Sequence, residues 1–263
     1  MRPFTPFTNI AMLMLDFTER LGRAGIFLVV SCVRIITPPY KISPIIKQIH
    51  FIGARSLLLI VVSGVFIGMV VALQFYDALV RLGSVAMLGA AVGLVLVREL
   101  GPLLTALVII GRAGSSICAE IAIMRNENQI DALDCMAIDP YRYIIVPRFI
   151  AALFCIPVLS CVFIVVGIFG GYFVGCVLFG VSPGSYFGGM FDAVLWRDIL
   201  MSTIKALAFG LITIWVATVK GFFLHLDKSA FGSEGVSKVT TQAVVVSSIT
   251  VFFADYIISS IIL

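Results

Sequence analysis

Five long apolar stretches, separated by short polar segments, constrain the fold of this chain more than any other feature. Each is long enough to cross the roughly 30 Å hydrocarbon core of a bilayer, which takes about 20 helical residues. Of the 263 residues, 61% are hydrophobic and only 12% are charged, about half the charge of a typical soluble domain. We therefore predict an all-α integral membrane protein formed by a single domain. The predicted spans are 51–76, 85–124, 143–179, 199–219 and 239–263.

Two of these stretches are too long for one straight span. The stretch 85–124 would measure about 60 Å as a helix. Gly101-Pro102 offers a break inside it, so it is either a long kinked helix or a re-entrant piece followed by a span. The stretch 143–179 contains a glycine series, which favours tight helix packing over a conformational hinge. These glycines are Gly167, Gly170, Gly171 and Gly175.

The N-terminal segment 9–36 has a different pattern. Its first half carries charges at helical spacing, and the apolar run 24–33 that follows is too short to span. We predict a helix that lies in the membrane interface, with Arg34 and Lys41 at the headgroups. A tilted insertion is the alternative.

A long polar interruption at 125–148 divides the chain near its middle. Within it, 126–139 reads as an amphipathic helix with an apolar stripe and acidic residues on the other faces. Asn126 can cap its start. Asp139 ends it, because a residue that precedes proline is disfavoured in helical geometry.

A short amphipathic helix between membrane spans is a candidate docking element for another protein. We expect the apolar stripe to make the contact, with the acidic residues at its rim. A solvated helix without a partner is the alternative. The predicted docking residues are Glu127, Ile130, Asp131, Leu133, Asp134 and Met136.

The distribution of Lys and Arg predicts the orientation. Seven precede or begin the first span, and three lie in each of 125–148 and 220–238, whereas the two alternate loops hold one each. Thirteen against two is a decisive positive-inside bias. It places the N-terminus and the polar helix in the cytoplasm and the C-terminus outside. Basic residues at span ends do not indicate a nucleic acid partner.

Several ionisable residues fall inside the predicted spans, where an unpaired charge costs several kcal/mol. Arg98 and Glu99 are neighbours that point in different directions, so we expect Lys205 and Asp255 to be their partners. Two more, eight residues apart, share a helix face. The network either fixes helix register or contacts a charged lipid headgroup. The six residues are Arg98, Glu99, Arg112, Glu120, Lys205 and Asp255.

No catalytic constellation is visible in the sequence. The GxxxxGK[ST] pattern of a nucleotide-binding loop is absent, and GRAGSS at 111–116 lies in a span without the lysine. The six cysteines show no CxxC spacing and the two histidines are isolated, so we predict no metal site. Any ATP would be bound by a partner, and this chain would bind no cofactor of its own.

Three motifs closely resemble the MlaE/YrbE family of ABC-transporter permeases. They are VRELGP at 97–102, GRAGSSICAEIAIMR at 111–125 and ENQIDALDCMAIDPYRYIIVPR at 127–148. Shorter matches are VVSGVFIGMV at 61–70, GIFGG at 167–171 and TTQAVVVSS at 240–248. The resemblance covers nearly the whole chain in order.

The resemblance implies a homodimer in the inner membrane of Gram-negative bacteria that moves phospholipids between inner and outer membranes and maintains outer-membrane lipid asymmetry. The segment 126–139 would be the coupling helix on a separate ATPase subunit, which carries a STAS-domain protein. An MCE-domain protein would sit on the periplasmic side. The lipid cavity would lie at the dimer axis near 98–102. Its implied lipid contacts are Arg98, Glu99, Leu73, Tyr76 and Leu79.

Two other functions remain open at this stage. A secondary transporter or channel could use the intramembrane charges as a coupling pathway, but five spans without a visible inverted repeat argue against it. A membrane scaffold could recruit cytoplasmic proteins through 126–139.

Overall fold

The computed structural model describes residues 6–37, 42–224 and 232–262. In the first helix, side chains are described for Leu15 and for every residue from Thr18 onward. All regular elements in these ranges are helices, and the ranges contain no β-strand. The predicted all-α fold is confirmed.

Within the described ranges, five helical segments are long and apolar enough to cross a membrane, as predicted. They overlap the five predicted spans and extend most of them by several residues. The described segments are Ile42–Arg81, Val85–Asn126, Tyr141–Leu178, Trp196–Phe222 and Gly232–Ile262.

The first and third spans are each built from several helical pieces. The first consists of α2 (Ile42–Ile49), the π-helical turn η1 (His50–Ala54) and α3 (Arg55–Arg81). The third consists of the π-helical turn η5 (Tyr141–Ile145), α8 (Val146–Tyr172) and the π-helical turn η6 (Phe173–Leu178).

The second span is one continuous helical run, which excludes the re-entrant alternative. After the 3₁₀ turn η2 (Val85–Met87), it comprises α4 (Leu88–Val95), the π-helical turn η3 (Leu96–Leu100) and α5 (Gly101–Ile109). The π-helical turn η4 (Ile110–Gly114) and α6 (Ser115–Asn126) complete it. Pro102 has no N–H to donate, yet the helix continues through Gly101-Pro102. It does so because the π-helical turn η3 is wider than an α-helical turn, and in it the Gly101 N–H bonds to the Leu96 carbonyl.

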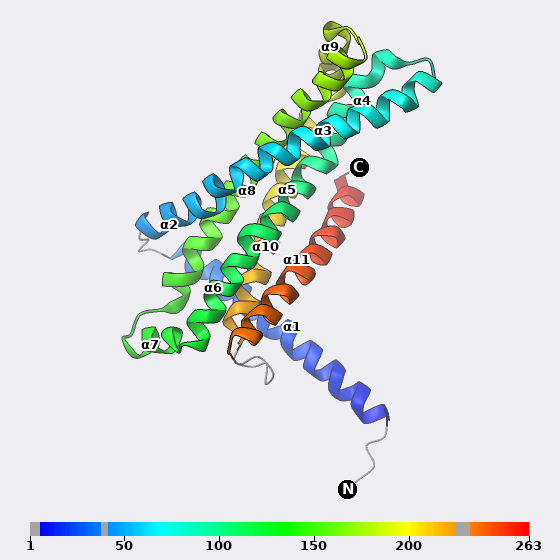
Figure 1. Ribbon diagram of the computed structural model, residues 1–263. Coiled ribbons are helices and arrows are strands. Elements are labelled where there is room, and N and C mark those ends of the chain that lie inside the picture. The colour runs from blue at the N-terminus through cyan, green and yellow to red at the C-terminus, as the bar shows by residue number, and fades with distance from the viewer. Residues whose placement is uncertain (1–5, 38–41, 225–231, 263) are drawn as a thin grey trace.

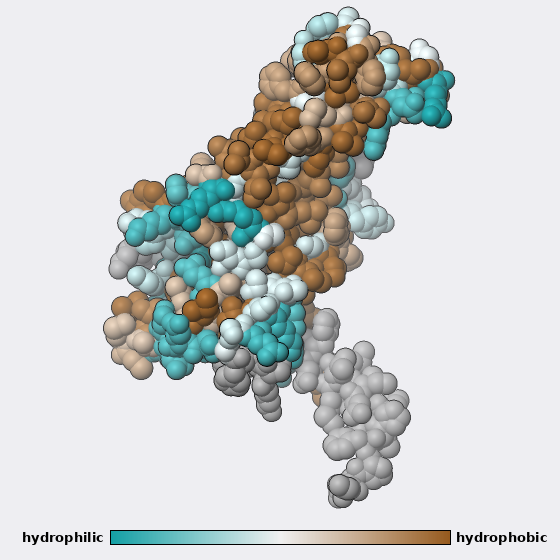
Figure 2. All heavy atoms as spheres, in the orientation of Figure 1, coloured by the Kyte–Doolittle hydropathy of each residue, from teal (hydrophilic) through white to brown (hydrophobic). Residues whose placement is uncertain are grey.

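The remaining elements are single helices. α9 (Pro183–Ala193) follows the third span, and α10 (Trp196–Phe222) and α11 (Gly232–Ile262) form the last two spans. Figure 1 shows α7 (Gln129–Cys135) at one end of the bundle and α9 at the other. Figure 2 shows an apolar surface over the body of the bundle and polar residues gathered toward its ends.

The predicted N-terminal helix is present as α1 (Pro6–Ile36), which is not among the five span segments. Its second half packs on the bundle near α7. Phe27 is fully buried against Tyr141 and Phe222, and Trp215 donates a hydrogen bond from Nε1 to the Ala24 carbonyl at 3.0 Å. The interfacial position of α1 stays a prediction.

Glycines bring α3 and α8 into backbone contact. A Cβ on Gly68 would lie 1.9 Å from the Gly167 carbonyl oxygen, and one on Gly170 would lie 2.4 Å from the Val65 carbonyl oxygen. No larger residue fits without separating the helices. The glycines therefore serve the tight packing that the sequence favoured.

The predicted helix 126–139 is wrong in its bounds. Asn126 is the last residue of α6 rather than a cap, and Asn128 turns the chain in a left-handed conformation (φ 55°), which asparagine tolerates. α7 ends at Cys135, because Ala137 is also left-handed (φ 57°) and Ile138 N–H bonds to the Leu133 carbonyl. This bonding pattern is a Schellman termination.

Candidate functional site

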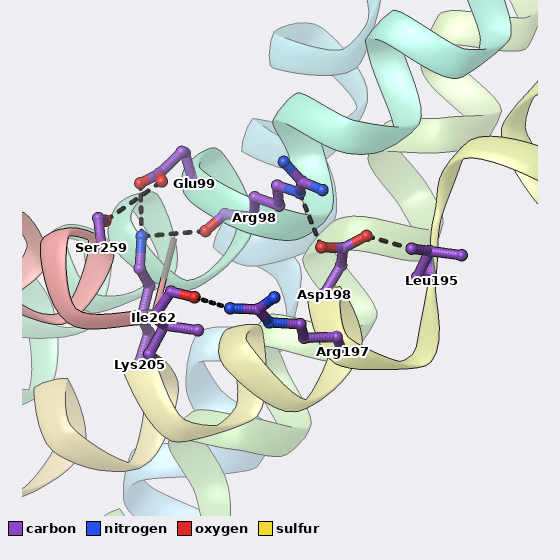
Figure 3. Close-up of polar contacts among 8 residues, drawn as sticks. All are labelled: Arg98, Glu99, Leu195, Arg197, Asp198, Lys205, Ser259 and Ile262. Carbon is purple, nitrogen blue, oxygen red and sulfur yellow. Dashed lines mark hydrogen bonds and ion pairs between the residues drawn. The ribbon is translucent and has the colours of Figure 1, made fainter.

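A cluster of charged side chains joins the second, fourth and fifth spans (Figure 3). At its centre is Lys205 of α10, whose side chain is 0% exposed. Its ammonium lies 2.6 Å from a Glu99 carboxylate oxygen and 2.8 Å from Asp255 of α11. It also donates a hydrogen bond to the Arg98 carbonyl at 3.1 Å. Lys205 is thus confirmed as a partner of Glu99.

Arg98 has a partner that the sequence reasoning missed. Its Nε lies 2.8 Å from Oδ1 of Asp198, a buried residue in the first turn of α10. Asp255 therefore pairs with Lys205 and does not pair with Arg98. The separate partners of Arg98 and Glu99 confirm that the two point in different directions. Asp198 follows the start of a helix, which is a position where acidic residues are common, and that signal could have identified it.

The cluster also holds the end of α11. Ser259 donates a hydrogen bond to Glu99 Oε1 at 3.3 Å, and Arg197 donates one to the Ile262 carbonyl. Only 11% of the span window in α11 is buried inside the chain. These polar contacts add to the apolar packing of Val251, Ala254 and Ile258 in holding α11 on the bundle.

Two of the π-helical turns expose backbone carbonyls that accept hydrogen bonds from cationic side chains. Lys205 contacts the Arg98 carbonyl in η3. Arg112 in η4 donates hydrogen bonds to the Phe51 carbonyl in η1 at 2.6 Å and to Ser56 Oγ at 2.7 Å. The Arg112 guanidinium also lies 5.1 Å from the Phe51 ring centroid, at cation–π distance. These contacts join the first two spans.

Glu120 lies two turns after Arg112 but has a different partner. Its carboxylate lies 2.8 Å from Arg148 of α8, whose side chain is buried. Arg112 and Glu120 thus have separate partners although they share a helix face. Arg112 links the second span to the first, and Glu120 links it to the third.

α7 presents a different face from the one predicted. Ile130 is fully buried in the core of the chain, and Leu133 packs partly against the same core. Ile130 therefore cannot be the centre of a docking contact, and of the predicted apolar docking residues only Met136 is exposed. Ile130 and Leu133 pack onto the chain itself, because burying them there removes apolar surface from water.

The exposed face of α7 is acidic, and exposed apolar residues, Met136 and Ile138, follow its end. Met136 is 61% exposed, and Asp134 and Glu127 are also exposed. Asp131 is exposed but lies 2.6 Å from Arg125. A partner would meet these residues.

The residues 45–261 match the family model described as Permease MlaE. The chain belongs to the MlaE permease family. This confirms the resemblance that the three central motifs carried.

Relatives of the MlaE family match almost the whole chain. The intermembrane phospholipid transport system permease protein MlaE of Haemophilus influenzae is 41% identical over 249 residues, 94% of each chain. A probable ABC transporter permease protein of Rickettsia prowazekii is 36% identical over 93% of each chain. One from Synechocystis is 32% identical over 81% of this chain and 80% of its own. The prediction of an ABC permease subunit, and not an enzyme, is confirmed by this membership.

The MlaE resemblance implied three residues of the first span as lipid contacts in a cavity, and their surroundings in the structure differ. Leu73 is 53% exposed, whereas Tyr76 stacks on Phe179 with ring centroids 4.0 Å apart and Leu79 packs against the core. Of the three, Leu73 presents the most open apolar surface. Their contact with lipid stays a prediction.

The described residues contain no group of three or more His, Cys, Asp or Glu side chains placed to hold a metal ion. In this MlaE-family chain, the polar chemistry of the described spans therefore consists of ion pairs and hydrogen bonds. Arg98 and Glu99 keep about a third of their side-chain surface exposed. Unlike the buried Lys205 and Asp198, they could be reached by a bound ligand.

Proposed function

We propose that this chain is the permease subunit of an ABC transporter that moves phospholipids between the inner and outer membranes and so maintains outer-membrane lipid asymmetry. The observation that carries the proposal is the 41% identity, over 94% of both chains, with the Haemophilus influenzae intermembrane phospholipid transport permease. Five apolar spans with charged residues held between them fit a route for an amphiphile.

We propose the orientation and partners that the charge distribution and the family resemblance support. The α7 end would face the cytoplasm of a Gram-negative cell and the α9 end the periplasm, with the C-terminus periplasmic. A homodimer would dock an ATPase subunit at α7, and ATP would bind there and not to this chain. A STAS-domain protein would accompany the ATPase, and an MCE-domain protein would sit at the α9 end.

In the proposed mechanism, ATPase closure moves α7 together with the bundle. Because Ile130 is buried in the core, α7 cannot shift without pulling the elements that it packs against. The motion would reach η3 through the continuous second span. There Arg98 could exchange Asp198 for a lipid phosphate, since a guanidinium binds both kinds of anion.

The proposed function is tested with the chain and its ATPase subunit reconstituted in liposomes. ATP should drive transfer of labelled phospholipid to acceptor vesicles that carry the periplasmic partner, and a non-hydrolysable ATP analogue should not. A secondary transporter would work without the ATPase, and a scaffold would transfer no lipid in either condition. Either of these results would refute the proposal.

A separate variant tests the role of Arg98. Arg98→Ala should lower the yield of co-purified phospholipid and the transfer rate while leaving ATPase binding unchanged. Unaltered lipid binding and transfer in a correctly assembled complex would exclude Arg98 as a headgroup ligand.

A further inference from the structure

A cleft of about 280 Å³ opens between the end of α1, the start of α2 and the segment that follows α7. One part of its wall is polar and comes from Arg34, Thr37, Asp139 and Arg142. The rest is mainly apolar and includes Ile45 and Val146. The cleft lies apart from the charge cluster around Lys205, which it shares no residue with.

The polar wall is a pair of guanidiniums arranged around one carboxylate. Arg34 Nε lies 3.0 Å from Asp139 Oδ2, and Arg142 Nε lies 3.8 Å from the same oxygen. Asp139 is itself held in place, because its Oδ1 accepts a hydrogen bond from the Tyr141 N–H at 3.0 Å. Two positive charges against one negative charge leave the wall cationic.

The guanidiniums retain donors for an additional anion. Arg142 uses Nη2 to donate to Thr37 Oγ1 at 3.3 Å, and Arg34 contacts Asp139 through Nε. Each guanidinium has five N–H donors, and its fork matches the oxygens of a phosphate. Both side chains are more than a third exposed, so a ligand can reach them.

The position of the cleft indicates that the anion would come from a lipid. The first span segment begins at Ile42 and the third at Tyr141, so both begin beside the cleft, at an end where the chain is expected to leave the membrane. At such an end the two guanidiniums would lie near the depth of the lipid phosphates. The outward residues Ile42 and Ile46 of α2 are strongly exposed and offer apolar surface to acyl chains.

We propose that this cleft binds the phosphodiester headgroup of a phospholipid from the adjacent leaflet, as a fixed lipid that ties α1 to the segment after α7. The volume of about 280 Å³ is at the small end for ligand pockets and suits a headgroup, with the acyl chains outside it. The bound lipid bridges two elements that are more than 90 residues apart. This site does not depend on the proposed transport function and concerns a lipid that is not cargo.

The test uses the purified full-length chain, delipidated in detergent and titrated with dioleoyl phosphatidylglycerol under native mass spectrometry. The double variant Arg34→Gln/Arg142→Gln should weaken the tightest lipid adduct by about tenfold, the scale expected when charge-assisted bidentate pairs are lost. The matched control is Arg81→Gln, which removes an exposed arginine at the far end of the first span. It should leave binding unchanged.

A second variant separates lipid binding from a purely structural role of the ion pairs. Asp139→Asn removes the carboxylate that competes with the phosphate, so it should preserve or tighten lipid binding even if it lowers the melting temperature. Loss of the adduct in Asp139→Asn, or equal binding by the double variant and the wild type, would overturn the proposal.

Two further arms identify the occupant. Inorganic phosphate at the same concentration should displace little lipid, and efficient displacement would show a free-anion site instead. Addition of the ATPase subunit should leave the lipid bound, whereas its release would show that the cleft is a protein docking surface. Each of these contrary results overturns the assignment, and neither bears on whether ATP-driven lipid transfer occurs.

Discussion

Asp198 holds Arg98 at 2.8 Å with one carboxylate oxygen and accepts the Leu195 N–H with the other at 2.9 Å. The same side chain therefore secures the start of α10 and neutralises a charge on the second span. A phosphate that drew Arg98 away would leave Asp198 its backbone contact but remove its counter-ion. The pair thus links a ligand-accessible arginine to the position of a neighbouring span.

We expect Asp198→Asn to lower the free energy of unfolding by about 1–3 kcal/mol, because the ion pair is lost while asparagine can still accept the Leu195 N–H. Thermal unfolding in detergent measures the change. Asp192→Asn, at an exposed position in α9, is the control and should have little effect. An unchanged melting temperature in Asp198→Asn would show that Arg98 does not depend on this partner.

Lys205→Met should destabilise the chain by about 3–5 kcal/mol, because two carboxylates lose the buried cation between them. Neutralising both carboxylates in the same chain, with Glu99→Gln and Asp255→Asn, should restore much of the stability. Melting temperatures of the single and triple variants provide the comparison. A triple variant as unstable as Lys205→Met would show that the loss comes from packing and not from charge.

Gly68→Ala should separate α3 from α8, because its methyl group would overlap the Gly167 carbonyl. We expect poor yield or a melting temperature lowered by several degrees. Gly188→Ala is the matched control: a Cβ there meets no atom within 4 Å, and alanine in an open helix position gains about 0.5–1 kcal/mol. The two variants should therefore shift stability in opposite directions.

Charge reversal at Asp134, combined with Met136→Asp, should weaken co-purification of the ATPase subunit without lowering the melting temperature, since both residues are exposed. Ile130→Ala should instead destabilise the chain by about 2–5 kcal/mol through a core cavity. Pull-down and thermal unfolding of the same preparations separate the two effects. Normal recovery of the ATPase by the double variant would remove α7 as the docking element.

Hydropathy predicted the spans well because burial of apolar residues in lipid is a property of each stretch by itself. The Lys205–Glu99 pair was also accessible to sequence reasoning, since a buried charge must find an opposite one. Asp198 was missed because the apolar pattern placed the start of the fourth span at residue 199, whereas α10 begins at Trp196. A boundary drawn on hydropathy assigns such a capping residue to a loop.

The direction of the apolar stripe on α7 could not be predicted from its periodicity. Helical spacing shows that Ile130 and Leu133 share a face, but it does not show whether that face meets another protein or the same chain. The left-handed residues Asn128 and Ala137 set the direction of α7 and so determine which way this face points. Such turns depend on tertiary packing, and an alanine in this conformation has no local signal.

The backbone contact at Gly68 and Gly167 also limits how the molecule can change shape. Where α3 and α8 meet at Gly68 and Gly167, backbone faces backbone, and there is no side chain at that point whose rearrangement could let the helices shift. We therefore expect the first and third spans to move together. Rearrangement in a transport cycle is then expected where the second span meets the last two spans, because the contacts of Arg98 and Glu99 there are polar and can be exchanged one at a time.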